Sequence, residues 1–572
     1  MNDMKLVITS RTDGFGSRML SFLNVMYIAN KINVNFGFVW KKRFYGENEV
    51  FVDCEENIFS KDYIKKHSFT NKIDESLEVD FFPVNDFNDF NDFNDFKRKY
   101  KEYTYFYYNI PDVLDSKHIK KIDLIDYQNT IPVLWNDIDF SEEYRKIIYE
   151  ANSYSESIGK YISFQLRAGD VVYSDHLREN ISPIRKARFS PVELVLYKII
   201  QIKKENPEYN ILLVSDDLDA ISAIQRRLKD DNIDIYIILQ FNSHIVDPMQ
   251  KTLFDLIMLS KSKIIYAPGR STYGLLASVV GGARLDCFLD KDDSSQYNAM
   301  NKYIKSFYVN DLQKAFSYFC LYNLAEKLGK ADELKILYLE SALSFDKHNC
   351  AYIILLTYLY IKNNQYEKAN QIIKFILEIK HDRFFKVLLG KEFGNYLLNR
   401  ELEYFLNIKA DLYPYLCYLV SKVCLDKGFL LRSYLYAFLS YKHGWMDKHI
   451  KHFFSNIQTI DVKNLIFDNQ YCAEFRIKNH LSYLIGQELI NSHKKRQYIY
   501  LYPKIFKIYI KYLCNRTKEN SVSLSDCIDY ESSKSIMECF TYRLGKEFIY
   551  ATKNWYKGGY IIFLLRLKKG KI

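Results

Sequence analysis

Glycines and polar residues that could bind an anion follow a short apolar run near the start of the chain, in the stretch Asp13-Gly-Phe-Gly-Ser-Arg18. In a strand-to-helix turn, Gly14 and Gly16 would let the backbone approach a ligand closely and point the first helical amides at it. The same two glycines could serve only to make the turn, and both interpretations stay open. The candidate residues from this stretch are Asp13, Gly14, Gly16 and Arg18.

A second group of candidates lies in Ser163-Phe-Gln-Leu-Arg-Ala-Gly-Asp170, where an apolar strand runs into a turn. Arg167 and Asp170 would project at the carboxyl end of that strand. The planar guanidinium of an arginine can bind a phosphate there through two parallel hydrogen bonds. The alternative is that Arg167 and Asp170 form an ion pair on the surface. Gln165 precedes them on the same strand.

The third group joins two stretches, Ser215–Asp217 and Pro268–Gly274, that each follow a short apolar run. The carboxylates of Asp216 and Asp217 suit the ribose hydroxyls or the base edge of a nucleotide, although one of them could instead cap a helix that begins at Leu218. The second stretch suits a diphosphate if a helix begins there, because helix amides neutralise negative charge. Its candidate residues are Arg270, Ser271 and Thr272.

A metal ion is not expected among these groups. The pair Asp216 and Asp217 lacks the surroundings of a magnesium–nucleotide site, and histidines and cysteines do not cluster at metal-ligand spacing. The ten cysteines include no CxxC pair, so they are expected to be reduced side chains that fill cores.

Alternating strands and helices must position the candidate residues. Short β-branched runs predict strands at 5–10, 36–40, 161–166, 211–214, 233–239 and 263–266, and amphipathic stretches predict helices at 19–31, 191–204, 218–229 and 274–280. This alternation predicts an α/β fold of two successive Rossmann-like domains, residues 1–145 and 146–310, with ligands at the carboxyl ends of the strands. Four Asn-Asp-Phe triplets between Asn85 and Phe96 have a period that fits neither a packed helix nor a strand, so a surface insertion is expected there.

After residue 310 the chain is expected to be almost entirely helical. Two helices at 331–346 and 366–382 lie about 35 residues apart, close to the roughly 34-residue period of tetratricopeptide repeats. Residues 311–465 are therefore predicted to form a tetratricopeptide-like α-solenoid.

A clearer internal repeat occupies residues 466–572. Leu481–Ile490 aligns with Phe540–Ile549, matching glycine to glycine and glutamate to glutamate, and each copy leads into a basic, aromatic stretch at 494–511 and 553–571. Such stretches could lie on an anionic membrane surface. The alternative is that these helices only cap the solenoid and keep their aromatic side chains in its core.

Net charge and hydropathy limit the class of partner. The chain has 572 residues, with 80 Lys+Arg against 70 Asp+Glu, and its net charge of +10 favours anionic ligands or a membrane surface over nucleic acid. Its apolar runs fall well short of the roughly 18 residues that cross a bilayer, and its first residues do not resemble a signal peptide. We therefore expect a cytoplasmic protein, with attachment to the inner face of the membrane as a further expectation.

The three candidate groups together resemble a known enzyme superfamily. The opening Ser10–Arg18 and the following Val39-Trp-Lys41 look like the start of the rhizobial nodulation α-1,6-fucosyltransferases. Ser163–Asp170 is similar to the HxRRxD segment shared by α-1,2-, α-1,6- and protein O-fucosyltransferases. Leu212–Asp217 and Asp255–Gly274 resemble the second and third donor-site motifs of that superfamily, so the likeness covers about half of the chain.

The resemblance implies a GT-B fold, a GDP-sugar donor that is usually GDP-fucose, inversion at the sugar carbon and no metal requirement. It implies an acceptor side in residues 1–145 and a nucleotide-sugar side in residues 146–310, with Arg167 on the donor diphosphate. Gln165 and Ala168 depart from the family histidine and second arginine. These departures leave open a different GDP-sugar or a site that has lost activity.

The leading hypothesis is an inverting, metal-independent glycosyltransferase that moves a sugar, most simply fucose, from a GDP-sugar to a bacterial surface glycan or glycolipid. Arg167 would stabilise the leaving diphosphate, and either Asp13 or Asp170 would accept the proton of the acceptor hydroxyl. The helical half would dock on a membrane or an assembly partner. The alternative is a catalytically inactive GT-B-like binding module on a tetratricopeptide-type scaffold. A Rossmann oxidoreductase is disfavoured because the first turn lacks a third glycine.

Overall fold

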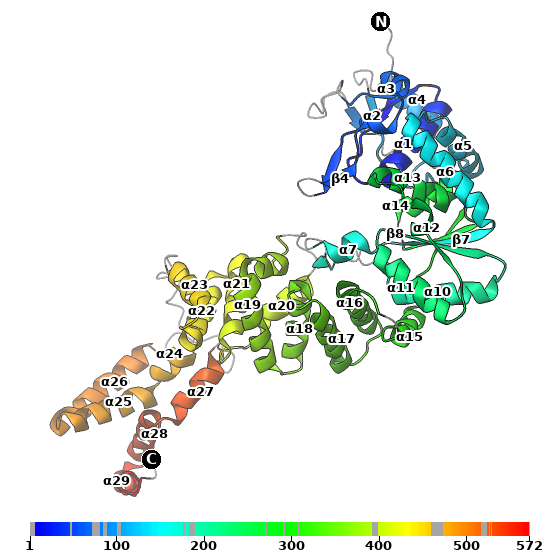
Figure 1. Ribbon diagram of the computed structural model, residues 1–572. Helices are drawn as coiled ribbons and strands as arrows, with labels where there is room; N and C mark the ends of the chain where they lie inside the picture. The colour runs from blue at the N-terminus through cyan, green and yellow to red at the C-terminus, as the bar shows by residue number, and fades with distance from the viewer. Residues whose placement is uncertain are drawn as a thin grey trace. The chain divides into compact units, whose positions relative to one another are not determined.

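The computed structural model forms two compact units, Met1–Lys347 and His348–Ile572. The first unit contains two parallel β-sheets with helices, and the regular elements described in the second are all helices (Figure 1). An α/β half followed by a helical half is the fold class that the sequence predicted. The structure describes all residues except 1–5, 46–48, 71, 73–80, 84–87, 100–104, 175–177, 182–188, 270, 290–291, 307, 392–397, 459–472, 516–522, 525–526, 528 and 571–572.

The first sheet has the strand order β2-β1-β6-β5, and all of its strands are parallel. β1 (Leu6–Thr9) is buried along its whole length and leads directly into the turn that carries the first candidate group. The other strands are β2 (Asn35–Phe38), β5 (Phe81–Pro83) and β6 (Tyr105–Tyr107), while β3 (Arg43–Tyr45) and β4 (Glu49–Val52) form a separate antiparallel pair. The accompanying helices are α1 (Phe15–Lys31), α2 (Glu55–Ile58), α3 (Lys61–His67), α4 (Phe90–Lys99), α5 (Leu124–Asn136) and α6 (Glu142–Ile158).

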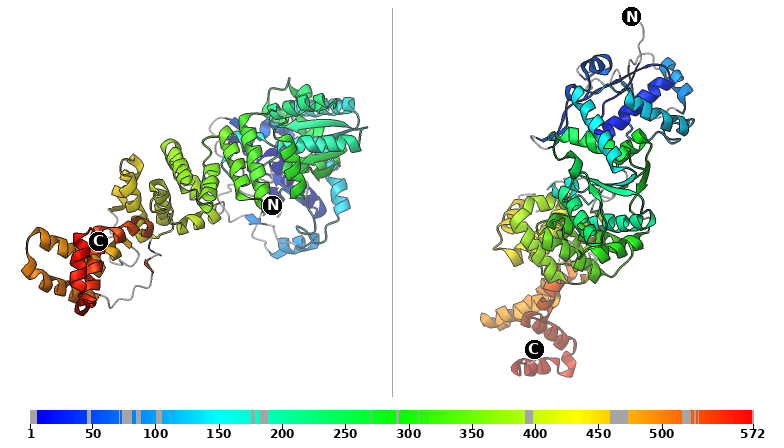
Figure 2. Two further views of the ribbon diagram at one scale, coloured as in Figure 1. Left: turned by 90° about the horizontal axis from the view of Figure 1, so that it is seen from below. Right: turned by 45° about the vertical axis from the view of Figure 1, so that its right-hand side comes forward.

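The second sheet has the order β11-β10-β7-β8-β9 and is also parallel. The central strand β7 (Tyr161–Leu166) is fully buried, as expected for a parallel strand that helices cover on both faces (Figure 2). The other strands are β8 (Asn210–Ser215), β9 (Tyr236–Ile237), β10 (Ile264–Ala267) and β11 (Arg284–Cys287). The helices of this part are α7 (Gly169–Tyr173), α10 (Val192–Glu205), α11 (Leu218–Asp230), α12 (Leu239–Asn242), α13 (Pro248–Ser260), α14 (Thr272–Gly281), α15 (Asp293–Tyr303), α16 (Asp311–Lys327) and α17 (Asp332–Phe345).

Two segments of the first unit differ from the prediction. The strand expected over 233–239 shrinks to β9, because it pairs only with β8 at the sheet edge and α12 begins at Leu239. The expectation that the Asn-Asp-Phe triplets form no packed helix is wrong for α4. Over one short helix, side chains three residues apart stay near one face. Phe93 is accordingly fully buried, with its ring centroid 5.1 Å from that of Phe106.

The second unit begins with helices that pack in pairs, α18 with α19 and α21 with α22. α18 (Cys350–Lys362) is buried on nearly every side, which explains its almost uninterrupted apolar sequence. α19 (Tyr366–Leu388) contains a non-helical residue, Lys380, and continues past the end predicted for it. Helix pairs agree with the sequence pattern, and a regular tetratricopeptide period stays a prediction. The next helices are α20 (Asn399–Asn407), α21 (Pro414–Asp426), α22 (Leu430–Gly444) and α23 (Lys448–Gln458).

The predicted C-terminal repeat is a repeat of structure. The first long helix of one copy, α25, packs on its counterpart α28 at Gly486 and Gly545. A Cβ atom on Gly486 would lie 1.8 Å from the carbonyl oxygen of Thr541, and one on Gly545 would lie 1.8 Å from that of Ser482. The contacts are reciprocal, so an approximate two-fold axis relates α25 and α28. This C-terminal module (residues 473–570) contains α24 (Ala473–Lys478), α25 (Leu481–Lys494), η3 (Tyr498–Tyr500), α26 (Leu501–Asn515), α27 (Tyr530–Glu538), α28 (Phe540–Lys553), η5 (Trp555–Lys557) and α29 (Gly559–Lys568).

Candidate functional site

The first candidate group lies on the turn between β1 and α1, and Asn109, just after β6, holds that turn. Thr9 Oγ1 donates to Asn109 Oδ1 at 2.8 Å, and the Ser10 amide donates to the same oxygen at 3.0 Å. The Arg11 guanidinium donates to the carbonyl oxygen of Asn109. Sequence reasoning missed Asn109, because the short strand β6 that precedes it was not predicted.

Asp13, one of the two candidate bases, is ion-paired. Arg11 Nε donates to Asp13 Oδ1 at 2.9 Å, and Arg11 Nη2 donates to Oδ2. The carboxylate remains partly accessible, with 36% of the Asp13 side chain exposed. A carboxylate held in this way has a fixed direction and keeps lone pairs for a further donor such as a hydroxyl.

Arg18, a predicted donor-binding residue, stabilises the turn by hydrogen bonds to backbone carbonyl oxygens. It is buried, and its three guanidinium nitrogens donate to the carbonyl oxygens of Asp13, Thr12 and Lys41 at 2.8, 3.0 and 2.6 Å. The guanidinium also lies 5.2 Å from the centroid of the Trp40 ring. Burial lowers the pKa of Arg18 to about 10. These contacts make Arg18 a positioning residue of the turn, and a contact between Arg18 and a ligand stays a prediction.

The amino-terminal ends of α1 and α14 meet although they are far apart in the sequence. A Cβ atom on Gly16 would lie 2.9 Å from Cα of Tyr273, so the close approach of the two backbones requires glycine at position 16. Next to this contact, Ser17 Oγ and Thr272 Oγ1 lie 3.0 Å apart. The structure thus brings the first and third candidate groups together.

Gln165 and Ser271 join the second and third groups. Ser271 Oγ donates to Gln165 Oε1 at 2.8 Å, and the same hydroxyl caps α14 by accepting from the Gly274 amide at 3.2 Å. A Cβ atom on Gly274 would lie 2.7 Å from Gln165 Oε1. Both side chains are buried, so Gln165 fixes the start of α14 to β7.

The neighbouring carboxylates of the third group have different partners. Asp216 is exposed, and its Oδ1 accepts from the amide of Ala168 at 2.9 Å. Ala168 itself is fully buried. Asp216 therefore ties the end of β8 to the turn after β7.

Asp217 is buried and structural. Its Oδ1 caps α11 by accepting from the Ala220 amide at 2.9 Å, which confirms the helix-cap interpretation for one of the two aspartates. Its Oδ2 accepts from the Tyr173 hydroxyl at 2.9 Å and from the side-chain amide of Gln313. No local sequence pattern connects Gln313, on α16, with this strand end.

The remaining predicted residues are described in part. Arg167 is half-buried, and its backbone exchanges two hydrogen bonds of 3.0 Å with Ser190, which fixes the turn after β7. Asp170 lies in the short helix α7, but its side chain and the whole of Arg270 are outside the described residues.

Together these contacts form one continuous path from Gly16 to Asp216 across the strand ends of both sheets. The first turn of α1 has Gly14 at its N-cap, which provides no capping side chain. Helix amino-terminal ends carry partial positive charge and bind anions. The arrangement is therefore suited to a phosphate group or another anion. In the part of the chain that the structure describes, His, Cys, Asp and Glu side chains form no group of three that could hold a metal ion.

Comparison with known proteins finds a family model that matches the end of the chain and solved structures that cover about half of the chain. A family described as a domain of unknown function (DUF8374) matches residues 433–571. No curated protein matches the chain. Among solved structures, POFUT1 in complex with GDP-fucose is 12% identical with a TM-score of 0.33, covering 50% of this chain and 99% of that one. The fucosyltransferase NodZ from Bradyrhizobium is 12% identical with a TM-score of 0.30, covering 48% and 92%.

Among the helices that the structure describes, none is both long enough and apolar enough to cross a bilayer.

Proposed function

We propose that the first unit is an inverting glycosyltransferase with a GT-B-like pair of Rossmann-like domains. It transfers fucose from GDP-fucose without a metal ion. The observation that carries the proposal is the meeting of α1 and α14 at Gly16 and Thr272. It brings the first amides of two helices to the strand ends of both sheets, and such amides suit a diphosphate. The sequence resemblance of the same three segments to fucosyltransferase motifs supports this assignment.

The proposed reaction gives each candidate residue a task. The acceptor oxygen forms a bond to the anomeric carbon while the bond from that carbon to the diphosphate oxygen breaks, and GDP leaves. Arg167 stabilises the charge that develops on the diphosphate. The acceptor proton passes to Asp13 or Asp170. Asp13 is already oriented by Arg11, which suits a group that must receive a proton from a fixed direction.

The proposed acceptor is a bacterial surface glycan or a lipid-linked glycan. Residues 311–465 were predicted to form a tetratricopeptide-like solenoid, and the part of this range in the second unit, from His348 on, is proposed to dock an assembly partner. The helix pairs α18–α19 and α21–α22 support such a surface.

A catalytically inactive binding module is the second candidate, and one observation favours it. Where the resembling family has a second arginine, this chain has Ala168, which is fully buried with its amide bonded to Asp216. The site therefore lacks a cation that the family uses near the diphosphate. A module of this kind would bind GDP and leave GDP-sugars intact.

Release of nucleotide from a panel of sugar nucleotides tests the proposal. The full-length chain is incubated with GDP-fucose, GDP-mannose or UDP-glucose in the presence of EDTA, and free GDP or UDP is measured. The proposal expects slow hydrolysis of GDP-fucose without acceptor, and faster release when lipid-linked or soluble bacterial glycans are added. Binding of GDP with no release from either GDP-sugar would identify the inactive module instead.

A further inference from the structure

The two copies of the C-terminal module carry the same charge pattern. Residues 494–515 and 553–571 each contain six lysines and arginines and no aspartate or glutamate. Both stretches follow the helices that pair at Gly486 and Gly545, so the positive charge is duplicated together with the fold.

In the first copy, α26 packs one apolar face inward and leaves another uncovered. Ile505 and Ile508 contact the buried cluster around Ile485. The outward side chains recur every three or four residues and form one stripe along the helix. This stripe consists of Tyr502, Phe506, Tyr509 and Leu513, and 65% of Phe506 is exposed.

In the second copy, α29 repeats that arrangement. Phe563 is buried against α28, whereas 67% of Ile561 and 61% of Leu564 are exposed. The preceding turn exposes Trp555 and Tyr556 as well. α26 therefore presents aromatic and aliphatic side chains outward, and α29 presents aliphatic side chains next to the exposed aromatic pair of the preceding turn.

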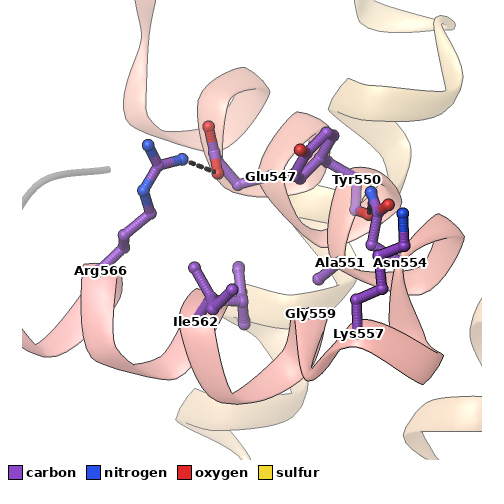
Figure 3. A pocket seen from close by; sticks show the side chains of 9 residues that line it. Glu547, Tyr550, Ala551, Asn554, Lys557, Gly559, Ile562 and Arg566 are labelled. Carbon is purple, nitrogen blue, oxygen red and sulfur yellow. Dashed lines mark hydrogen bonds and ion pairs between the residues drawn. The ribbon is translucent and has the colours of Figure 1, made fainter.

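Specific contacts fix these outer faces in place. Arg566 donates to Glu547 at 2.7 Å across a hollow of about 180 Å³ between α28 and α29 (Figure 3). In the other copy, Nζ of Lys504 lies 3.2 Å from Oε1 of Glu488, the residue that aligns with Glu547. A Cβ atom on Gly559 would lie 2.4 Å from the carbonyl oxygen of Ala551, so α29 begins in close contact with α28. The repeated glutamates thus hold each outer helix, and the exposed stripes belong to the folded module.

The alternative that these aromatic and aliphatic side chains fill the core of the solenoid is excluded, because they are exposed when the full chain is present. A second copy of the module is disfavoured as the partner, because both basic stretches carry six cations and no acidic residue, and like charges repel. An apolar stripe with tyrosine, tryptophan and flanking lysines fits the interface of a bilayer that contains anionic lipid. We propose that the C-terminal module binds such a surface through α26 and α29.

Duplication strengthens this binding. An amphipathic helix with a few lysines binds lipid weakly by itself, and two such helices on one rigid module act as linked sites whose affinities reinforce each other. Removal of either stripe is therefore expected to cost most of the affinity. The proposal does not depend on the proposed transferase activity, because lipid binding is measured without donor or acceptor.

Flotation of the full-length chain with vesicles tests the proposal. We expect recovery with phosphatidylcholine vesicles that contain phosphatidylglycerol, and little recovery with phosphatidylcholine alone. The stripe variant Phe506→Ser with Leu564→Ser should lose recovery, while the matched control Val246→Ser with Leu337→Ser, at exposed apolar positions of the first unit, should retain it. Replacing Lys507 and Lys568 with glutamine should weaken partitioning about thirtyfold, since each lysine near an anionic surface contributes a factor of about five.

Tryptophan fluorescence gives an independent readout. Trp40 and Trp135 are buried, so a blue shift on addition of anionic vesicles should disappear in Trp555→Phe and persist in Trp445→Phe. The proposal is overturned if flotation is absent, if the stripe variant floats like the wild type, or if the shift survives in Trp555→Phe. Concentration-dependent dimerisation that the stripe variant abolishes, without flotation, would assign the face to a second copy and also overturn it.

Discussion

Glycine brings helices into close contact in both units, but the contacts have different consequences. At Gly16 the contact lies in the first turn of α1 and against the first turn of α14, where amides have no partner within the helix. At Gly486 and Gly545 it lies in the middle of α25 and α28, where the amides bond within the helix. The place of a glycine contact along a helix therefore decides whether it can build an anion site or only pack a core.

The largest expected effect falls on a side chain of the strand-end site. Arg167→Ala should lower turnover by about 2–4 kcal/mol of transition-state stabilisation, as is usual for a preorganised charge-stabilising donor. Arg167→Lys should remain impaired, because an ammonium cannot reproduce two parallel hydrogen bonds. Turnover of GDP-fucose measures both, with the exposed Arg226→Ala on α11 as the matched control. Wild-type turnover in Arg167→Ala would instead support the alternative that Arg167 only forms an ion pair on the surface.

A mid-helix glycine should affect stability alone. Gly545→Ala is expected to destabilise the C-terminal module by about 1–3 kcal/mol, because the new Cβ would overlap a backbone carbonyl that cannot rotate away. Hydrogen exchange of α25 and α28 measures the loss. The neighbouring exposed Lys546→Ala should change it by less than about 0.5 kcal/mol. A loss of GDP binding free energy in Gly545→Ala as large as its loss of module stability would contradict the distinction between the two glycine contacts.

The glycine at the helix ends should show the opposite behaviour. Gly16→Ala introduces a smaller overlap, 2.9 Å from Tyr273 Cα, so it should cost only about 1 kcal/mol of stability. It should nevertheless reduce GDP affinity, because separating α1 from α14 moves the amides that face the diphosphate. Calorimetric titration of this variant beside Gly545→Ala measures the difference. Equal affinities in the two variants would show that Gly16 only packs the helices.

Local patterns in the sequence predicted β1, β7, β8 and β10, the strands that lead into the candidate groups. The strand 161–166 coincides with β7, and the helix predicted over 218–229 is α11, one residue longer. Both rest on hydrophobic periodicity within a few residues, which a sequence displays directly. The Asn-Asp-Phe segment, predicted to form no packed helix, contains α4, and Phe93 of this helix packs on Phe106 of strand β6. A contact of this kind depends on the tertiary fold.

The candidate site divides in the same way. Strand ends identified Gly16, Gln165 and Ser271 as residues that would come together, and they do. The sequence did not connect Asn109 or Gln313 with them, because β6 was not predicted and Gln313 lies inside a helix rather than at a strand end. The sequence also could not reveal that the guanidinium of Arg18 would donate hydrogen bonds to backbone carbonyl oxygens.

Calorimetric titration of the full-length chain with GDP in the presence of EDTA tests the central claim most directly. The account predicts that one GDP binds per chain, and that UDP, CMP and NAD bind far more weakly. GDP at about 100 times its dissociation constant should also stabilise the first unit by roughly 2.7 kcal/mol. Preference for UDP over GDP, or binding that appears only with Mn²⁺, would contradict the assignment of a metal-independent GDP-sugar site.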